Sequence, residues 1–173
     1  MNIDLIFKGM REAQVSFDKD WMHYGSYVVE LTDMRVKDSQ KDGLPVFICR
    51  FKVLESNNPE DPVGANRSWT LKGKSLQYGI SDIKALMFAI AGVDAGRLLP
   101  TDPAHEQADL LFRYVLGSES AKKELEALAE DERPAADFYV GARVRLETKP
   151  KAPDKPFTRH FWGPAPAAEG AAA

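Results

Sequence analysis

Alternating hydrophobic and polar residues predict five β-strands in this chain. Three are expected in the first half of the chain and two near its end, and their expected bounds are Gly25–Val36, Pro45–Leu54, Asn66–Lys72, Phe138–Glu147 and Phe157–Trp162. The first segment is rich in β-branched residues, and the Asp42-Gly43 pair after it is a strong hairpin signal. The period of two residues indicates that each strand has one buried face.

The hydrophobic period lengthens between the third and fourth predicted strands. Helices are predicted from Ser81 to Gly92, from Asp102 to Leu116 and from Ser118 to Ala129. Each has hydrophobic residues three or four positions apart, which is typical of a helix that packs on a core. We therefore expect a helical insertion over about residues 80–130.

Three strands, a helical insertion and two further strands predict a mainly β, α+β fold, a five-stranded OB-fold-like barrel with the helices between strands 3 and 4. In that fold the loops between strands 1 and 2 and between strands 4 and 5 hold oligonucleotides along strands 2 and 3. The 173 residues suffice for one well-filled domain. We expect this domain at residues 25–162, with an N-terminal extension at 1–24 and a flexible tail at 163–173.

Positive charge is concentrated near the end of the chain. The whole sequence has a net charge of -3, and residues 101–137 carry ten acids against four Lys or Arg. Residues 138–162 carry six Lys or Arg against two acids, and the predicted loop Lys149–Pro156 within them holds three lysines and three prolines. A basic segment on an otherwise acidic chain favours a single binding face.

Cations interleaved with aromatic residues suit single-stranded nucleic acid, because phosphates attract cations and unpaired bases stack on rings. The expected phosphate contacts are Lys37, Lys41, Arg50, Lys52, Arg67, Arg143, Arg145, Lys149, Lys151, Lys155 and Arg159. The expected stacking residues are Trp69, Tyr139, Phe161 and Trp162. For each aromatic residue, packing in the core is an equal alternative. The cations would supply salt-dependent affinity, and stacking would add about 1–3 kcal/mol per base without selecting a sequence.

The sequence lacks the motifs of common enzyme classes, including a P-loop, a dinucleotide-binding fingerprint and a nucleophile elbow. Its histidines are too scattered for a zinc cluster, and the single cysteine, Cys49, is expected in the core. Acidic residues around His105 are interpreted as the polar start of a helix rather than as a nuclease site. We predict a protein without enzymatic activity, metal or cofactor. The sequence shows no membrane span or signal peptide, which predicts a cytoplasmic protein.

Several short segments are similar to those of small bacteriophage proteins that bind single-stranded DNA through an OB-fold. They are Gly25-Ser26-Tyr27, Val53-Leu54-Glu55-Ser56, Pro62-Val63-Gly64 with Ser68-Trp69, and Thr158-Arg159-His160-Phe161-Trp162. The resemblance covers about residues 25–162. It implies strand coating during DNA replication, recombination or repair in the host cytoplasm, with replication or recombination proteins as partners.

One departure from that family lies at the C-terminus. Such proteins often end in an acidic tail that recruits other proteins, whereas residues 163–173 are nearly uncharged. The alternative function is a non-catalytic protein-interaction module with an OB-like barrel, because such barrels also dock proteins. The sequence leaves the oligomeric state open.

Overall fold

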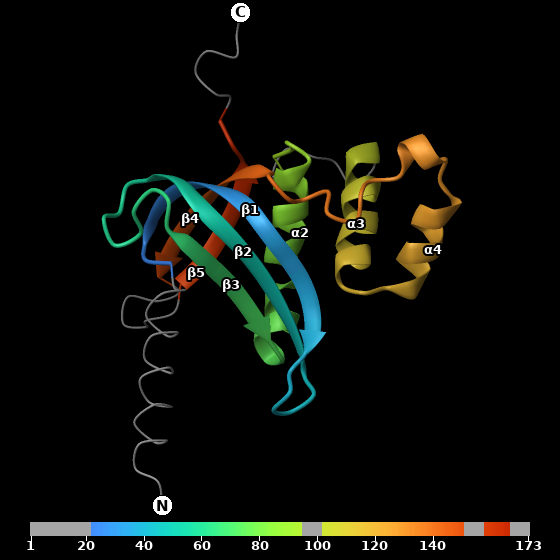
Figure 1. The fold of residues 1–173 in the computed structure, drawn as a ribbon, viewed down its shortest axis with the longest axis horizontal. Helices are drawn as coiled ribbons and strands as arrows, with labels where there is room; N and C mark the ends of the chain where they lie inside the picture. Colours follow the sequence, from blue (N-terminus) through green and yellow to red (C-terminus); the bar gives the residue numbers. More distant parts are fainter. Residues whose placement is uncertain (1–21, 95–101, 151–157, 167–173) are drawn as a thin grey trace, which may run out of the picture.

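The computed structural model describes residues 22–94, 102–150 and 158–166. In these ranges the chain forms five β-strands, three α-helices and one short 3-10 helix (Figure 1). In chain order they are β1 (Gly25–Asp38), β2 (Pro45–Ser56), β3 (Asn66–Lys72), α2 (Lys74–Ile90), α3 (Pro103–Val115), α4 (Glu119–Ala127), η2 (Glu130–Glu132), β4 (Arg143–Pro150) and β5 (Thr158–Pro164). The prediction of five strands in a mixed α+β chain is confirmed.

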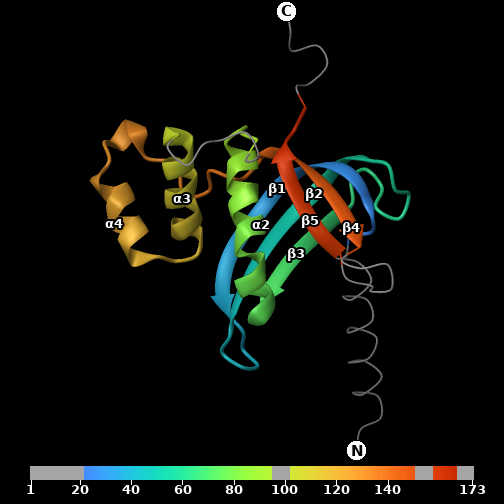
Figure 2. The same cartoon turned by 180° about the vertical axis from the view of Figure 1, so that it is seen from behind.

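The strands form one antiparallel sheet in the order β3-β2-β1-β4-β5. The central strand, β1, pairs with β2 along its length and with β4 through Gly25–Glu30. Its pairing with β2 shifts register between Val28 and Val29 and again between Leu31 and Asp33, and such bulges bend and twist a sheet. The two edge strands, β3 and β5, form no ladder with each other in the described part of the chain. Instead α2 contacts both of them (Figure 2).

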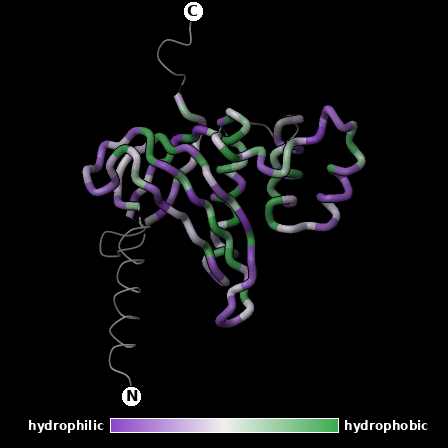
Figure 3. Tube along the Cα trace, viewed as in Figure 1, coloured by the Kyte–Doolittle hydropathy of each residue, from purple (hydrophilic) through white to green (hydrophobic). Residues whose placement is uncertain are grey.

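The inner face of the sheet and one side of α2 enclose the hydrophobic core. On β2 the inward residues Phe47, Cys49, Phe51 and Val53 are all fully buried, as their alternation predicts. From α2, Ile83 and its neighbours at helical spacing fill the concave side of the sheet. Figure 3 shows hydrophobic stretches in β2 and α2, and mainly hydrophilic residues at the tip of the β1–β2 hairpin.

The helix α2 begins at Lys74, well before the predicted start at Ser81. Gly73 ends β3 with a φ of 54°, a conformation in which glycine is strain-free, and the helix starts directly after it. Gly79 lies inside the helix and is buried, and a β-carbon there would collide with the side chain of Leu71. The absence of a side chain at Gly79 therefore allows close packing of α2 against β3.

The strand β4 begins later and ends later than predicted. Residues 138–141 form turns. Gly141 has a φ of 81° and donates its main-chain N–H to the carbonyl of Leu31, whose own N–H donates to the carbonyl of Ala142 at the end of the β1–β4 ladder. Val140, predicted to face the core, is 51% exposed. The assignment of Lys149 and Pro150 to a loop was wrong, since both belong to β4 and pair with β5. The remainder of the predicted basic arm, residues 151–157, lies outside the described residues.

The helices α3 and α4 lie beyond α2, on the side away from most of the sheet (Figure 1). Ser118 caps α4 by accepting a hydrogen bond from the main-chain N–H of Ala121 at 3.4 Å. Arg113 of α3 donates to Asp109 and to both carboxylate oxygens of Glu124 on α4. In the described ranges no helix is long and apolar enough to cross a membrane.

Candidate nucleic-acid interface

The strands carry an excess of positive charge, and the helices carry an excess of negative charge. The five strands contain ten Lys or Arg and five acidic residues. The described helices contain five Lys or Arg and nine acidic residues. Eight strand cations are exposed, namely Arg35, Lys37, Arg50, Lys52, Arg143, Arg145, Lys149 and Arg159. Because the alternate positions fill the core, the strands must carry these cations on their outer face, where they set the local field.

On the outer face of the sheet, cations flank acidic residues of the central strand. Glu30 of β1 pairs in register with Lys52 on β2 and with Arg143 on β4. Asp33 pairs in register with Arg50 and lies 3.3 Å from the guanidinium of Arg35. Arg50 and Lys52 are exposed, as predicted for their face of β2. The cations of β2 and β4 therefore form two lines, one on either side of β1.

The β1–β2 hairpin brings two of the predicted cations near the start of α2. Lys37 and Lys41 are exposed at its end. The carboxylate of Asp42 lies 2.7 Å from the ammonium of Lys72 at the end of β3. The main-chain N–H of Gly73 donates to the carbonyl of Pro45, where β2 begins after the hairpin turn, at 3.4 Å. These contacts position the hairpin beside the first turn of α2.

An exposed ring with two cations beside it lies where β4 ends and β5 begins. Phe161 of β5 is 40% exposed on the outer face. The Lys149 ammonium lies 5.7 Å from the centre of this ring, and the Arg159 guanidinium lies 5.0 Å from it. Both distances are within the range of cation–π attraction. Lys149 also forms an ion pair of 3.1 Å with Glu147, and Arg145 lies over Gly163, where a β-carbon would be 3.0 Å from its guanidinium.

A cleft of about 460 Å³ lies between the start of α2 and the edges of the sheet. Its walls come from β3, α2, β4 and β5, and are formed by Trp69, Leu71, Ser75, Tyr78, Gly79, Asp82, Lys149, Pro150, Arg159, His160 and Phe161. The β1–β2 hairpin adjoins the same first turn of α2. The cleft thus lies between the hairpin cations and the cations around Phe161.

Two of the four aromatic residues predicted to stack on bases belong to the core. Trp69 is 5% exposed, stacks on His160 with ring centres 5.4 Å apart and meets Phe47 edge-on. Trp162 is 8% exposed and packs edge-on against Phe51. Their rings lie 5.4 Å apart and connect β3 to β5, two strands that form no ladder with each other in the described residues. The prediction of a stacking role for Trp69 and Trp162 is therefore corrected to core packing.

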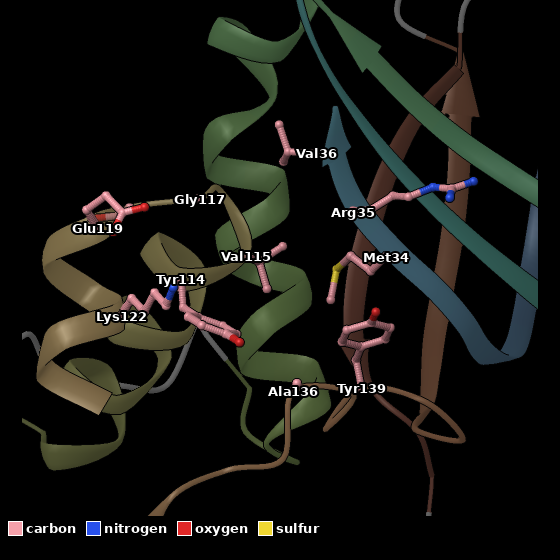
Figure 4. A pocket seen from close by; sticks show the side chains of 11 residues that line it. Met34, Arg35, Val36, Tyr114, Val115, Gly117, Glu119, Lys122, Ala136 and Tyr139 are labelled. Atoms are coloured by element: carbon pink, nitrogen blue, oxygen red, sulfur yellow. The ribbon is translucent and has the colours of Figure 1, made fainter. Parts of the chain in front are cut away.

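The predicted stacking residue Tyr139 lies apart from Phe161. It is half-buried in the turns before β4 and packs edge-on against Phe138. It lines a second cleft of about 370 Å³ between β1 and the helices α3 and α4 (Figure 4). Figure 4 shows Met34 and Tyr139 on one side of this cleft and Tyr114 on the other. Phe161 is therefore the one predicted stacking residue that presents its ring on the outer face of the strands.

Arg67 is held in a buried ion pair instead of facing solvent. Its Nε lies 2.6 Å from Asp61, which is fully buried, and Arg67 also donates to two main-chain carbonyls. Asp61 further accepts from the main-chain N–H of His23 at 2.6 Å and from the Tyr27 hydroxyl at 3.1 Å. Arg67 is therefore corrected from a phosphate contact to a structural residue.

The ion pair perturbs the titration of its neighbours. Burial raises the pKa of the Asp61 carboxyl, but hydrogen bonds from the His23 main chain and from Arg67 outweigh it and hold this pKa below its usual range. Burial and the adjacent Asp61 charge raise the pKa of Tyr27. Sequence analysis missed this cluster because Asp61 lies in a loop rich in turn formers and meets His23 across 38 positions of the chain.

Other predicted features have structural roles or lie outside the described residues. Lys151 and Lys155 belong to the latter group. Two members of the acid–histidine cluster have structural contacts: His105 packs edge-on against Phe88, and Asp109 pairs with Lys84 at 3.4 Å and with Arg113. Among the described residues no group of three or more His, Cys, Asp or Glu could hold a metal ion.

The sequence matches no protein-family model, and a comparison with curated proteins finds no significant match. The resemblance to bacteriophage single-stranded DNA-binding proteins therefore stays a prediction.

Proposed function

We propose that this protein binds single-stranded DNA without sequence preference, on the outer face of a five-stranded OB-fold-like barrel. The strand order β3-β2-β1-β4-β5 supports this proposal, because a partly open barrel of this order would have its gap between β3 and β5. The position of α2 against both edge strands supports this interpretation, because the helix covers the gap that the ladder leaves.

The observation that carries the proposal is the separation of charge between the strands and the helices. A polyanion approaching the molecule meets the excess of cations on the strands and is repelled by the acidic helices. The exposed cations on β2, on β4 and around Phe161 would contact phosphates, while the ring of Phe161 would stack on a base. With Trp69 and Trp162 in the core, phosphate contacts would supply most of the affinity.

In this proposal the protein coats single strands during DNA replication, recombination or repair of a bacteriophage. Replication or recombination proteins would be its partners in the host cytoplasm. No catalytic step is involved, because binding protects the strand and keeps it unpaired. The alternative of a protein-docking barrel is tested by the same experiment.

The test is fluorescence anisotropy of a labelled oligo-dT strand at several salt concentrations, with the same oligonucleotide annealed into a duplex for comparison. We expect the single strand to bind more tightly than the duplex, with an affinity that falls steeply as salt rises. Replacing Arg50 and Lys52 together with alanine should weaken binding and reduce the slope of log K against log salt by about 1.4, since each single-strand phosphate contact contributes about 0.7.

A matched control removes the same charge from the acidic side of the molecule. Lys122 and Lys123 are exposed on α4, so their double alanine variant loses two charges outside the proposed interface. This control should keep the slope of the unaltered protein. An equal loss of affinity and of salt slope in the two double variants would refute the interface. Absence of binding by the wild-type protein at low salt would also refute it, and either result would favour protein docking.

A further inference from the structure

We infer that the 460 Å³ cleft between α2 and the sheet edges holds one nucleotide of the bound strand, with its base between Tyr78 and Phe161 and its phosphate at Lys149 and Arg159. This inference rests on the proposed function and adds a specific seat for a base within it. It also adds α2 to the interface, an element to which the sequence assigned only packing.

The two rings that line the cleft come from different elements. Tyr78 lies on the second turn of α2 and is 79% exposed, the largest exposed fraction of any exposed large hydrophobic side chain in the described residues. Phe161 lies on β5 and is 40% exposed. Exposed aromatic rings that line the same cleft from two elements are what a planar base requires, because both of its faces can stack.

Two further lining residues of the cleft are held by packing. Trp69 and His160 are almost fully buried and stack on each other, with an angle of 22° between their rings. Gly79 follows Tyr78 in α2 and packs against Leu71, so the helix approaches β3 closely at this point. A base in the cleft would therefore meet a prearranged surface, and little ordering would be needed on binding.

Charge on the two walls sets the orientation of the nucleotide. Lys149 and Arg159 lie on the strand wall within 6 Å of the Phe161 ring centre, whereas Asp82 lies on the helix wall. A phosphate is attracted to the strand wall and repelled from the helix wall. The base would accordingly stack on Phe161, with its own phosphate beside the two cations.

The combination of two rings and two cations identifies the class of ligand. A purely apolar peptide would bring no anion to either cation, and a phosphate alone would leave the rings unused. A nucleotide uses both, and the cleft volume lies within the range of small-ligand sites.

The experiment compares an oligo-dT strand with an abasic strand of the same length and charge. Phosphate contacts are the same in the two strands, so the ratio of their dissociation constants reports the contribution of the bases. We expect wild-type protein to bind oligo-dT at least about fivefold more tightly, which corresponds to the low end of stacking on a single aromatic residue. Tyr78→Ala and Phe161→Ala should each lower this ratio, and Tyr78→Phe should retain it because the ring is kept.

Val63→Ala is the control, because Val63 is 66% exposed in the loop before β3 and does not line the cleft. Suppose that the wild-type protein prefers single strand to duplex with a steep salt dependence, but that Tyr78→Ala leaves the ratio of the two dissociation constants unchanged. This result would overturn the cleft assignment and leave the proposed function standing. An equal loss for both strands in Tyr78→Ala would also overturn it. Absence of binding to either strand by the wild-type protein would overturn the proposed function and the cleft assignment together.

Discussion

The buried ion pair between Asp61 and Arg67 should be a large contributor to the stability of the domain. Asp61 has no exposed surface, and its carboxylate lies within hydrogen-bonding distance of three residues, His23, Tyr27 and Arg67. These contacts join His23 before β1, Tyr27 of β1, the loop before β3 and β3 itself. Asp61→Ala would remove all of them and leave the guanidinium of Arg67 largely buried without its carboxylate.

The expected cost follows from the burial of the two partners. Removing one member of a buried ion pair typically lowers the free energy of unfolding by about 3–5 kcal/mol, because the remaining charge is left buried without its partner. The Arg67 side chain keeps 13% of its surface exposed and retains its bonds to main-chain carbonyls, so the low end of that range applies, about 3 kcal/mol. This should lower the urea midpoint by roughly 1–3 M.

Urea unfolding followed by circular dichroism measures the effect. Asp42→Ala is the control, because Asp42 also pairs with a cation at 2.7 Å but both side chains are 38% exposed. Its midpoint should stay close to that of wild type. The argument that burial decides the strength of this pair would be refuted if Asp61→Ala lowered the free energy of unfolding by less than about 1 kcal/mol. It would also be refuted if the control lowered that free energy equally.

The same residue predicts a dependence on pH. The pKa of Asp61 is lower in the folded protein than the usual value near about 3.9, so its stabilisation is present above that value and is lost as pH falls through the folded pKa. Wild-type protein should lose stability relative to Asp61→Asn as pH falls below about 4. A constant difference between the two proteins from pH 7 to pH 3 would contradict this.

Three further predictions concern the core and the turns. Leu146→Ala should cost about 2–5 kcal/mol in urea unfolding, because Leu146 is fully buried, and an effect below 1 kcal/mol would show that the site is not packed. Gly141→Ala should cost about 1–2 kcal/mol through its positive φ alone, since no atom lies within 4 Å of the added β-carbon; a neutral effect would mean that the turn can change its conformation. Burial and then the charge of Asp33 raise the pKa of the Cys49 thiol, so a thiol reagent should modify Cys49 only after unfolding, and rapid labelling of native protein would contradict its burial.

The elements that sequence analysis located best are those with a clear hydrophobic period. β3 has the predicted bounds, and β2 differs from its prediction only at its end, because alternate residues such as Phe47 and Phe51 enter the core. The predicted start of α2 and the predicted bounds of β4 were wrong, and both errors occur near glycines whose effect depends on contacts with other elements. Gly79 packs against Leu71, and Gly141 bonds to Leu31.

Some residues of the candidate interface could likewise be placed from the sequence, and others could not. Period-two alternation places Arg50 and Lys52 on the outer face from sequence alone, because neighbours in a strand point to opposite sides. For β5 it separates Phe161 from Trp162, but only the structure shows that Trp162 is the buried one. Alternation gives no partner for a side chain, so it could not separate Arg67, whose side chain is ion-paired and largely buried, from Lys52, which is exposed.

By itself, the sequence determined the number of strands, the face of β2 that enters the core and the charge of the opposite face, since each depends on local spacing. The tertiary structure decided which aromatic residues are accessible and which cations are free of buried partners. The curved sheet brings Trp69 of β3 to His160 of β5 and thereby buries it, and it places Tyr78 of α2 on the same cleft as Phe161. Such contacts join residues more than 80 positions apart, and no local pattern encodes them.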